Sequence, residues 1–201
     1  MRLRRLLPVT AAVTLAGLAT FGCAEQSAGV RVGDDTVSES EMIDELNAFG
    51  NNDALFGEGQ ADAVRGDLEH SYTQRFAGEI VQQRIVFMLA AQIFEDEGLE
   101  LSDADRADAE QAMTDQMQGG FEAFPDDYRR SFTDDIAKYN VLAAELGEEG
   151  FNQALVDKAS STRIEVSSRF GEWNDAQLTI DPPPGPTPGP DTETTVPGAT
   201  G

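Results

Sequence analysis

The spacing of hydrophobic side chains along residues 71–97 predicts a long amphipathic helix. Apolar residues recur there at steps of three and four, the period at which side chains share one face of an α-helix. Gly98 follows, and glycine suits the position just beyond a helix C-terminus. The apolar surface covers more than half of the helix, so it is predicted to lie in the core or to line a groove: Phe76, Ile80, Val81, Ile85, Phe87, Met88, Ala91, Ile93 and Phe94.

Four other segments have the same helical period. Ser38, followed three residues later by Glu41, forms the capping box that opens the first of them. Ser102 with Asp105 marks the start of another, and Pro125 suits the first turn of a third. The four predicted helices cover residues 38–49, 102–118, 125–146 and 148–159.

Three short segments alternate apolar and polar residues, which is the period of a half-buried β-strand. They lie at residues 30–37, 163–166 and 177–180, at the two ends of the helical region. A lone strand or hairpin is marginally stable, so we expect the two ends to pair with each other. The predicted fold is therefore mainly α, a bundle of about five helices with a small β clasp.

The N-terminal residues resemble an export signal. A basic start at Arg2, Arg4 and Arg5 precedes an apolar run of about 16 residues, shorter than the ~20 that a membrane-spanning helix needs. Gly22 and Cys23 follow, as in a bacterial lipoprotein signal, although Thr20 and Phe21 depart from its usual residues. We expect residues 1–22 to be a signal peptide and Cys23 to carry a lipid that holds the chain at the outer face of the cell membrane. Cleavage that leaves a free thiol and an uncleaved anchor are the alternatives.

The rest of the chain divides into one domain between two tails. Residues 23–29 are small and polar and are expected to be a tether. Residues 30–180 have the ordinary size of a single domain. Residues 181–201 are rich in Pro, Gly and Thr, a composition that cannot bury a core, and are expected to be a disordered tail.

The charge of the chain is strongly negative. The formal net charge is -23, and loss of residues 1–22 would remove three arginines and no acidic residue, which gives -26. Such a surface repels nucleic acid and anionic lipid headgroups, so neither is an expected partner. It favours solubility first, and basic partners or divalent counterions second.

No catalytic constellation is visible in the sequence. His70 is the only histidine and Cys23 the only cysteine, and Cys23 lies at the signal junction. The acidic residues lack the spacing of a calcium loop, and the ligands of a structural zinc site are absent. We therefore expect no enzyme activity, no metal and no cofactor, with weak calcium binding left open.

The order of several short motifs resembles the N-terminal domain of SurA and PrsA-like periplasmic or cell-surface chaperones, in the form of short actinobacterial lipoproteins. The resemblance covers most of residues 30–173, with Ser168 standing where proline is common. It is carried by Val30-Arg31-Val32-Gly33-Asp34, Gln83-Arg84-Ile85-Val86, Gly98-Leu99-Glu100-Leu101-Ser102, Phe124-Pro125-Asp126-Asp127-Tyr128 and Ser168-Arg169-Phe170-Gly171-Glu172-Trp173.

The resemblance implies a chaperone that binds unfolded or newly exported polypeptides without nucleotide. Many relatives carry a parvulin prolyl isomerase domain before the last strand, and this chain has no room for one. Phe76, Ile80, Phe87 and Met88 are the expected polypeptide contacts, with a core role as their alternative. The rival functions are a lipoprotein that docks one envelope partner and an enzyme related to peptidyl-prolyl isomerases.

Overall fold

The computed structural model describes residues 27–56, 64–66, 72–117 and 119–182. It confirms a mainly helical fold with small antiparallel sheets. The described helices are α1 (Glu39–Gly50), α3 (Gln74–Asp96), α4 (Asp103–Met117) and α5 (Asp126–Ser161). The strands are β1 (Ala28–Val32), β2 (Asp35–Ser38), β3 (Ile164–Val166), β4 (Glu172–Asn174) and β5 (Thr179–Asp181).

Several predicted features lie outside the described residues. These are the signal peptide at residues 1–22, Cys23, His70 and residues 183–201 of the predicted tail. Within the described part, β1 already begins at Ala28, inside the range expected to be a tether. At the other end, Asp181 belongs to β5 rather than to the tail.

The number of helices differs from the prediction. The described residues form four helices rather than five, because the segments predicted at 125–146 and 148–159 belong to one element, α5. The two parts meet at Gly147, whose φ of 68° and ψ of 165° are not helical. Glycine has no Cβ and adopts this conformation readily, so the chain changes direction within one residue and needs no loop.

The strands also differ in arrangement from the single joining sheet that was expected. β2, β1 and β3 form one antiparallel sheet in that order, with Val30 opposite Val166 and Val32 opposite Ile164. β5 pairs with β4 in a separate two-stranded sheet, where Trp173 lies opposite Ile180. β4 was not predicted as a strand, because its three residues show no alternation long enough to recognise.

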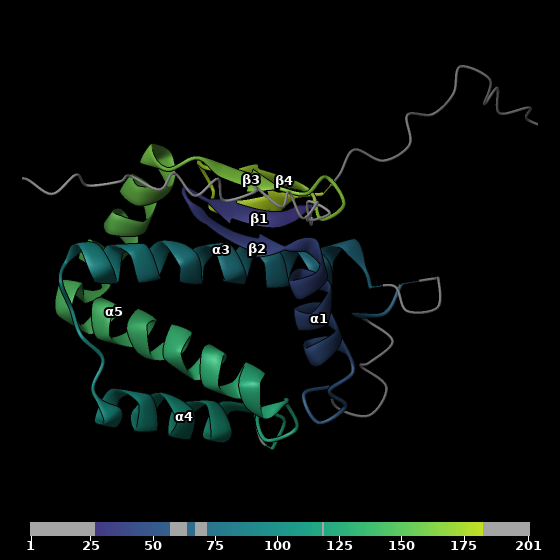
Figure 1. The fold of residues 1–201 in the computed structure, drawn as a ribbon, viewed down its shortest axis with the longest axis horizontal. Coiled ribbons are helices and arrows are strands. Elements are labelled where there is room, and N and C mark those ends of the chain that lie inside the picture. Colours follow the sequence, from purple (N-terminus) through teal and green to yellow (C-terminus); the bar gives the residue numbers. More distant parts are fainter. Residues whose placement is uncertain (1–26, 57–63, 67–71, 118, 183–201) are drawn as a thin grey trace, which may run out of the picture.

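The elements lie in layers (Figure 1). The sheets cover one side of α3, α5 packs along the opposite side of α3, and α4 packs on α5. α1 lies across one end of this stack, where it contacts β1, β2 and α3. The long apolar helix is therefore enclosed by a sheet on one side and a helix on the other, which explains its wide apolar surface.

The predicted helix ends are largely confirmed. Ser38 and Glu41 form the capping box at the start of α1, where the Ser38 backbone nitrogen donates to the Glu41 carboxylate at 2.7 Å. Ser102 and Asp105 exchange equivalent hydrogen bonds before α4. Pro125 precedes α5, and Gly98 follows α3 with a φ of 67°. These boundaries could be predicted because each depends on residues within one helical turn.

Candidate functional site

A hollow of about 470 Å³ lies among α3, α4 and α5, and we call it the apolar groove. Its hydrophobic side chains come from all three helices: Val86 and Phe87 from α3, Met113 from α4, and Ile136 and Tyr139 from α5. Its polar side chains are mainly amides: Gln82, Gln83, Gln116 and Asn140, with Glu79 beside them.

The groove has a buried floor and a more accessible wall. Phe87 and Met113 are buried, whereas Val86, Ile136 and Tyr139 are half-buried and keep part of their apolar surface open to a ligand. The polar residues Glu79, Gln116 and Asn140 are exposed. Apolar surface thus lies within reach of several amide groups, the usual composition of a small binding site in proteins.

Aromatic packing holds the floor of the groove in place. The Phe87 ring contacts Phe132 and Tyr139 edge to face, with ring centroids 5.8 and 6.1 Å apart. Tyr139 also packs edge to face on Phe151 beyond the kink, at 4.7 Å. Edge-to-face packing is a favoured geometry of aromatic pairs, so these contacts fix the Phe87 and Tyr139 rings that line the groove.

The residues predicted to contact polypeptide lie in different surroundings. Phe76, Ile80 and Phe87 have only 8%, 6% and 6% of their surface exposed and belong to the core. Met88 is half-buried and packs against the core. Among these four residues Phe87 alone lines the apolar groove. The binding role of all four stays a prediction, and their burial leaves little surface for a ligand in this conformation.

The groove residues that sequence analysis missed are Val86, Met113, Ile136 and Tyr139 with the four amides. Each helix taken alone shows an apolar stripe, and a stripe does not tell which residues face a neighbouring helix and which face an opening. The pair Gln82-Gln83, two uncharged polar residues within the strongest apolar pattern, was the available signal.

A buried polar cluster links the helices next to the groove. Arg84 on α3 donates to both carboxylate oxygens of Glu45 on α1, at 2.9 and 2.8 Å, and to Asp135 on α5 at 2.7 Å. Tyr128 on α5 donates its hydroxyl to Glu45 at 3.1 Å. We call these four residues the Arg84 cluster. Arg84 and Glu45 keep only 13% and 5% of their side chains exposed.

The ionised Arg84 cluster contains one positive and two negative charges. Burial lowers the pKa of Arg84, but the charges of Glu45 and Asp135 outweigh it and hold that pKa above its ordinary value. Burial raises the pKa of Asp135, and Arg84 offsets this only in part. The two pKa directions are consistent if the positive charge of Arg84 is neutralised mainly by Glu45, to which Arg84 donates two hydrogen bonds. Asp135 then carries the surplus negative charge.

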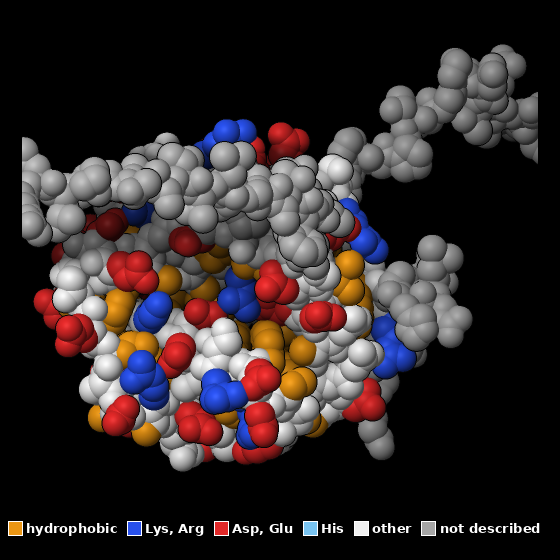
Figure 2. Space-filling model, viewed as in Figure 1, with side chains coloured by type: hydrophobic (Ala, Val, Ile, Leu, Met, Phe, Trp, Pro, Cys, Tyr) orange, Lys and Arg blue, Asp and Glu red, His pale blue; other side chains and the backbone are white. Residues whose placement is uncertain are grey.

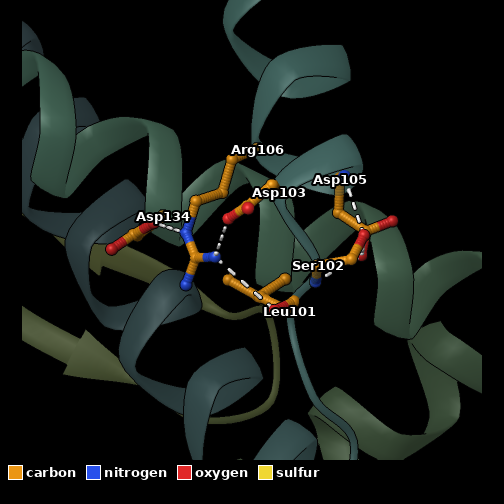
Figure 3. A network of polar contacts seen from close by, with 6 residues as sticks. All are labelled: Leu101, Ser102, Asp103, Asp105, Arg106 and Asp134. Carbon is orange, nitrogen blue, oxygen red and sulfur yellow. Dashed lines mark hydrogen bonds and ion pairs between the residues drawn. The ribbon is translucent and has the colours of Figure 1, made fainter.

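A second hollow, of about 640 Å³, lies between α4 and the start of α5 and contains three arginines. Figure 3 shows how Arg106 from α4 reaches Asp134 at 2.7 Å, Asp103 at 3.6 Å and the carbonyl of Leu101. Arg129 and Arg130 pair with Asp126 and Asp127, three residues earlier on α5. Each arginine thus has a carboxylate partner within the chain, although the Nε atom of Arg129 is buried without a hydrogen-bond partner among the described residues.

Two further features of the described residues bear on function. No group of three or more metal-ligating side chains is positioned to hold an ion in this part of the chain. None of its helices is both long and apolar enough to cross a membrane.

Comparison with family models, with curated proteins and with solved structures found no match in any of the three. The resemblance to the SurA and PrsA-like N-terminal domain therefore stays a prediction, and the apolar groove is the candidate functional site on the geometry alone.

Proposed function

We propose that this chain is a non-catalytic, chaperone-like lipoprotein that binds unfolded or newly exported polypeptides in the apolar groove. In this proposal a lipid on Cys23 holds the protein at the outer face of the membrane.

The observation that carries the proposal is the pairing of apolar and amide side chains in one groove. An extended polypeptide presents side chains together with unpaired backbone N–H and C=O groups. A glutamine or asparagine amide both donates and accepts hydrogen bonds, so Gln82, Gln83, Gln116 and Asn140 suit a backbone of any sequence. Val86, Ile136 and Tyr139 provide the apolar contact.

The size of the groove fits a short segment rather than a folded domain. At about 470 Å³ it lies within the range of roughly 300–1,000 Å³ that is usual for small-ligand sites. A few apolar side chains of an extended chain would fill it. Binding would therefore be brief and repeated along a client, which suits the holding of unfolded chains.

The chemistry of the groove supports a binding role without catalysis. Its titratable side chains are Glu79, which is exposed and pairs with Arg75 at 2.9 Å, and Tyr139, which packs on Phe87 and Phe151. General acid–base catalysis needs a proton carrier placed against a second reacting group. Glu79 is instead paired with the cation of Arg75, on the exposed side of α3.

The test is suppression of aggregation of two unrelated unfolded proteins by the full chain. We expect protection of both at micromolar ratios and reduced protection by Val86→Asp, which places a charge among the apolar groove residues. Val156→Asp is the matched control, since Val156 is 41% exposed and lies outside the groove. A second variant, Gln116→Trp, fills the groove from an exposed position and should not affect folding. Equal protection by both groove variants and wild type would contradict the proposal.

One observation favours a second candidate, a lipoprotein that docks a single envelope partner. Among the large hydrophobic residues of the described ranges, Val156 is the one that is exposed. A general chaperone is expected to offer more apolar surface than this. Failure to protect either unfolded protein, together with retention of one partner from an envelope extract, would support the docking function instead.

The lipid anchor has an independent test. We expect the wild-type protein in the membrane fraction of cells and Cys23→Ser in the soluble exported fraction. Membrane association that survives Cys23→Ser would contradict attachment through this residue.

A further inference from the structure

We infer that the apolar groove selects polypeptide segments in which apolar residues are flanked by lysine or arginine. This inference rests on the proposed function, because it assigns the class of ligand to the same groove. It follows from the charges that surround the groove rather than from its apolar floor.

The charged side chain that lines the groove is negative. Glu79 is the groove's one ionisable acid, and none of the lining residues, all of them in the described part of the chain, is lysine or arginine. Glu79 is held by Arg75 in an exposed pair one helical turn away, with side chains 58% and 89% exposed. Exposed pairs of this kind contribute about 0–1 kcal/mol, so a cationic ligand can replace Arg75 at little cost.

The helix α4, which contributes Met113 and Gln116 to the groove, carries mainly negative charges. Asp103, Asp105, Asp108, Glu110 and Asp115 stand on this helix against Arg106 as its one basic residue. Asp115 adjoins Gln116, which lines the groove, and is exposed. It accepts a hydrogen bond from the neutral side chain of Gln111, at 2.9 Å. Asp115 does not itself line the groove, so its negative charge would act on a ligand that extends past Gln116.

The negative charge of the rest of the molecule also favours cationic ligands. The chain has a formal net charge of -23, and the face shown in Figure 2 has acidic side chains interspersed with lysine or arginine and with hydrophobic side chains. Such a field attracts cationic segments and repels anionic ones, with a range of roughly 8 Å at physiological ionic strength. Glu79 in the groove and Asp115 next to Gln116 add negative charge close to the bound segment. We assign the preference for lysine and arginine to these two residues.

Three unstructured peptides test the inference, each with the same apolar centre and flanked by lysine, serine or aspartate. Binding to the full chain is measured by fluorescence anisotropy at low and at high salt. We expect the lysine-flanked peptide to bind roughly tenfold more tightly than the serine-flanked peptide at low salt, the scale of one or two ion pairs. The aspartate-flanked peptide should bind most weakly, and high salt should reduce these differences.

Matched double variants locate the preference. Glu79→Gln with Asp115→Asn should bring the ratio of the two affinities, lysine-flanked peptide over serine-flanked peptide, close to one, whatever the variant does to the serine-flanked peptide itself. Glu148→Gln with Glu149→Gln removes the same charge outside the groove and should leave the preference as it is. Equal affinity for the lysine- and serine-flanked peptides, or an equal effect of both double variants, would overturn the inference while the proposed function stands. No binding of any peptide would overturn the proposed function itself.

Discussion

Arg84 and Glu45 form a two-pronged ion pair that joins α3 to α1. The Arg84 Nε and Nη2 atoms donate to separate carboxylate oxygens of Glu45, at 2.9 and 2.8 Å. The third contact of Arg84, to Asp135, extends the link to α5. These three helices include two of the walls of the apolar groove, so the cluster helps to set the groove's shape.

Arg84→Met should destabilise the fold by about 3–5 kcal/mol, because it removes the cation from the buried carboxylate of Glu45 and from the half-buried carboxylate of Asp135. Arg75→Met on the same helix is the control, and it should change stability by less than about 1 kcal/mol, since Arg75 is 89% exposed. Denaturant unfolding at neutral pH measures both. Similar losses for the two variants would show that the buried cluster does not hold the helices together.

Asp135→Asn should stabilise the protein at neutral pH. Burial raises the pKa of Asp135, so the folded state holds this proton more tightly than the unfolded state, and ionisation at neutral pH costs stability. That cost disappears as the pH falls below the pKa of the folded state. The amide oxygen of asparagine can still accept the hydrogen bond from Arg84 without carrying the surplus charge.

The difference in unfolding free energy between Asp135→Asn and wild type is the quantity to measure. Other groups titrate in the opposite sense; the hydrogen bond from Ser38 lowers the pKa of Glu41, for example, and its stabilising effect is lost on acidification. Such contributions are common to both proteins and cancel in the difference. We expect the advantage of the variant to shrink from pH 7 to about pH 4, close to the ordinary pKa of aspartate. A constant or growing advantage would contradict the surplus charge on Asp135.

Two glycines of α5 should respond to alanine in opposite directions. Gly147→Ala should cost about 1–3 kcal/mol, because its φ of 68° and ψ of 165° suit glycine alone. An added Cβ would meet nothing within 4 Å, so the cost comes from the backbone. Gly150→Ala should gain roughly 0.5–1 kcal/mol, since its Cβ would meet only Leu146 at 3.6 Å and alanine favours the helix. Thermal unfolding measures the stability of both variants. A loss for Gly147→Ala together with a gain for Gly150→Ala would support a kink that requires glycine at position 147, and equal changes would contradict it.

α4 should be the least stable wall of the groove. It buries only Ala109 and Met113, whereas α3 buries eleven residues. Few buried apolar contacts predict frequent local opening. Hydrogen exchange should therefore be faster in α4 than in α3, and Arg106→Gln, which removes the contact with Asp134 in Figure 3, should accelerate exchange in α4 more than elsewhere. Equal protection of α3 and α4 would contradict this assignment.

Local features of the fold were predictable, and the arrangement of its parts was less so. The capping box of Ser38 and Glu41 and the end of α3 before Gly98 each depend on a few neighbouring residues. The continuity of α5 through Gly147 depends on one backbone conformation that glycine permits but does not require. The separation of β4 and β5 from the other sheet depends on contacts between distant segments.

The candidate site shows the same limit. Phe87 was named because it stands in a strong apolar pattern, and it does line the groove. Phe76 and Ile80 stand in the same pattern and are as buried as Phe87, but they do not line the groove. Helical periodicity alone does not distinguish an apolar residue that lines the groove from one that does not, because the groove is formed by side chains of three helices, α3, α4 and α5. Met113 stands in the apolar stripe of the predicted helix at 102–118, and that stripe did not indicate that it faces an opening.

The most direct test of polypeptide binding in the apolar groove is to record the NMR chemical shifts of the full chain during titration with an unfolded polypeptide. Binding in the groove predicts shifts at Val86, Ile136 and Tyr139 and unchanged signals at Val156, which lies outside it. Unchanged groove signals, or shifts centred on Val156, would contradict the proposed function.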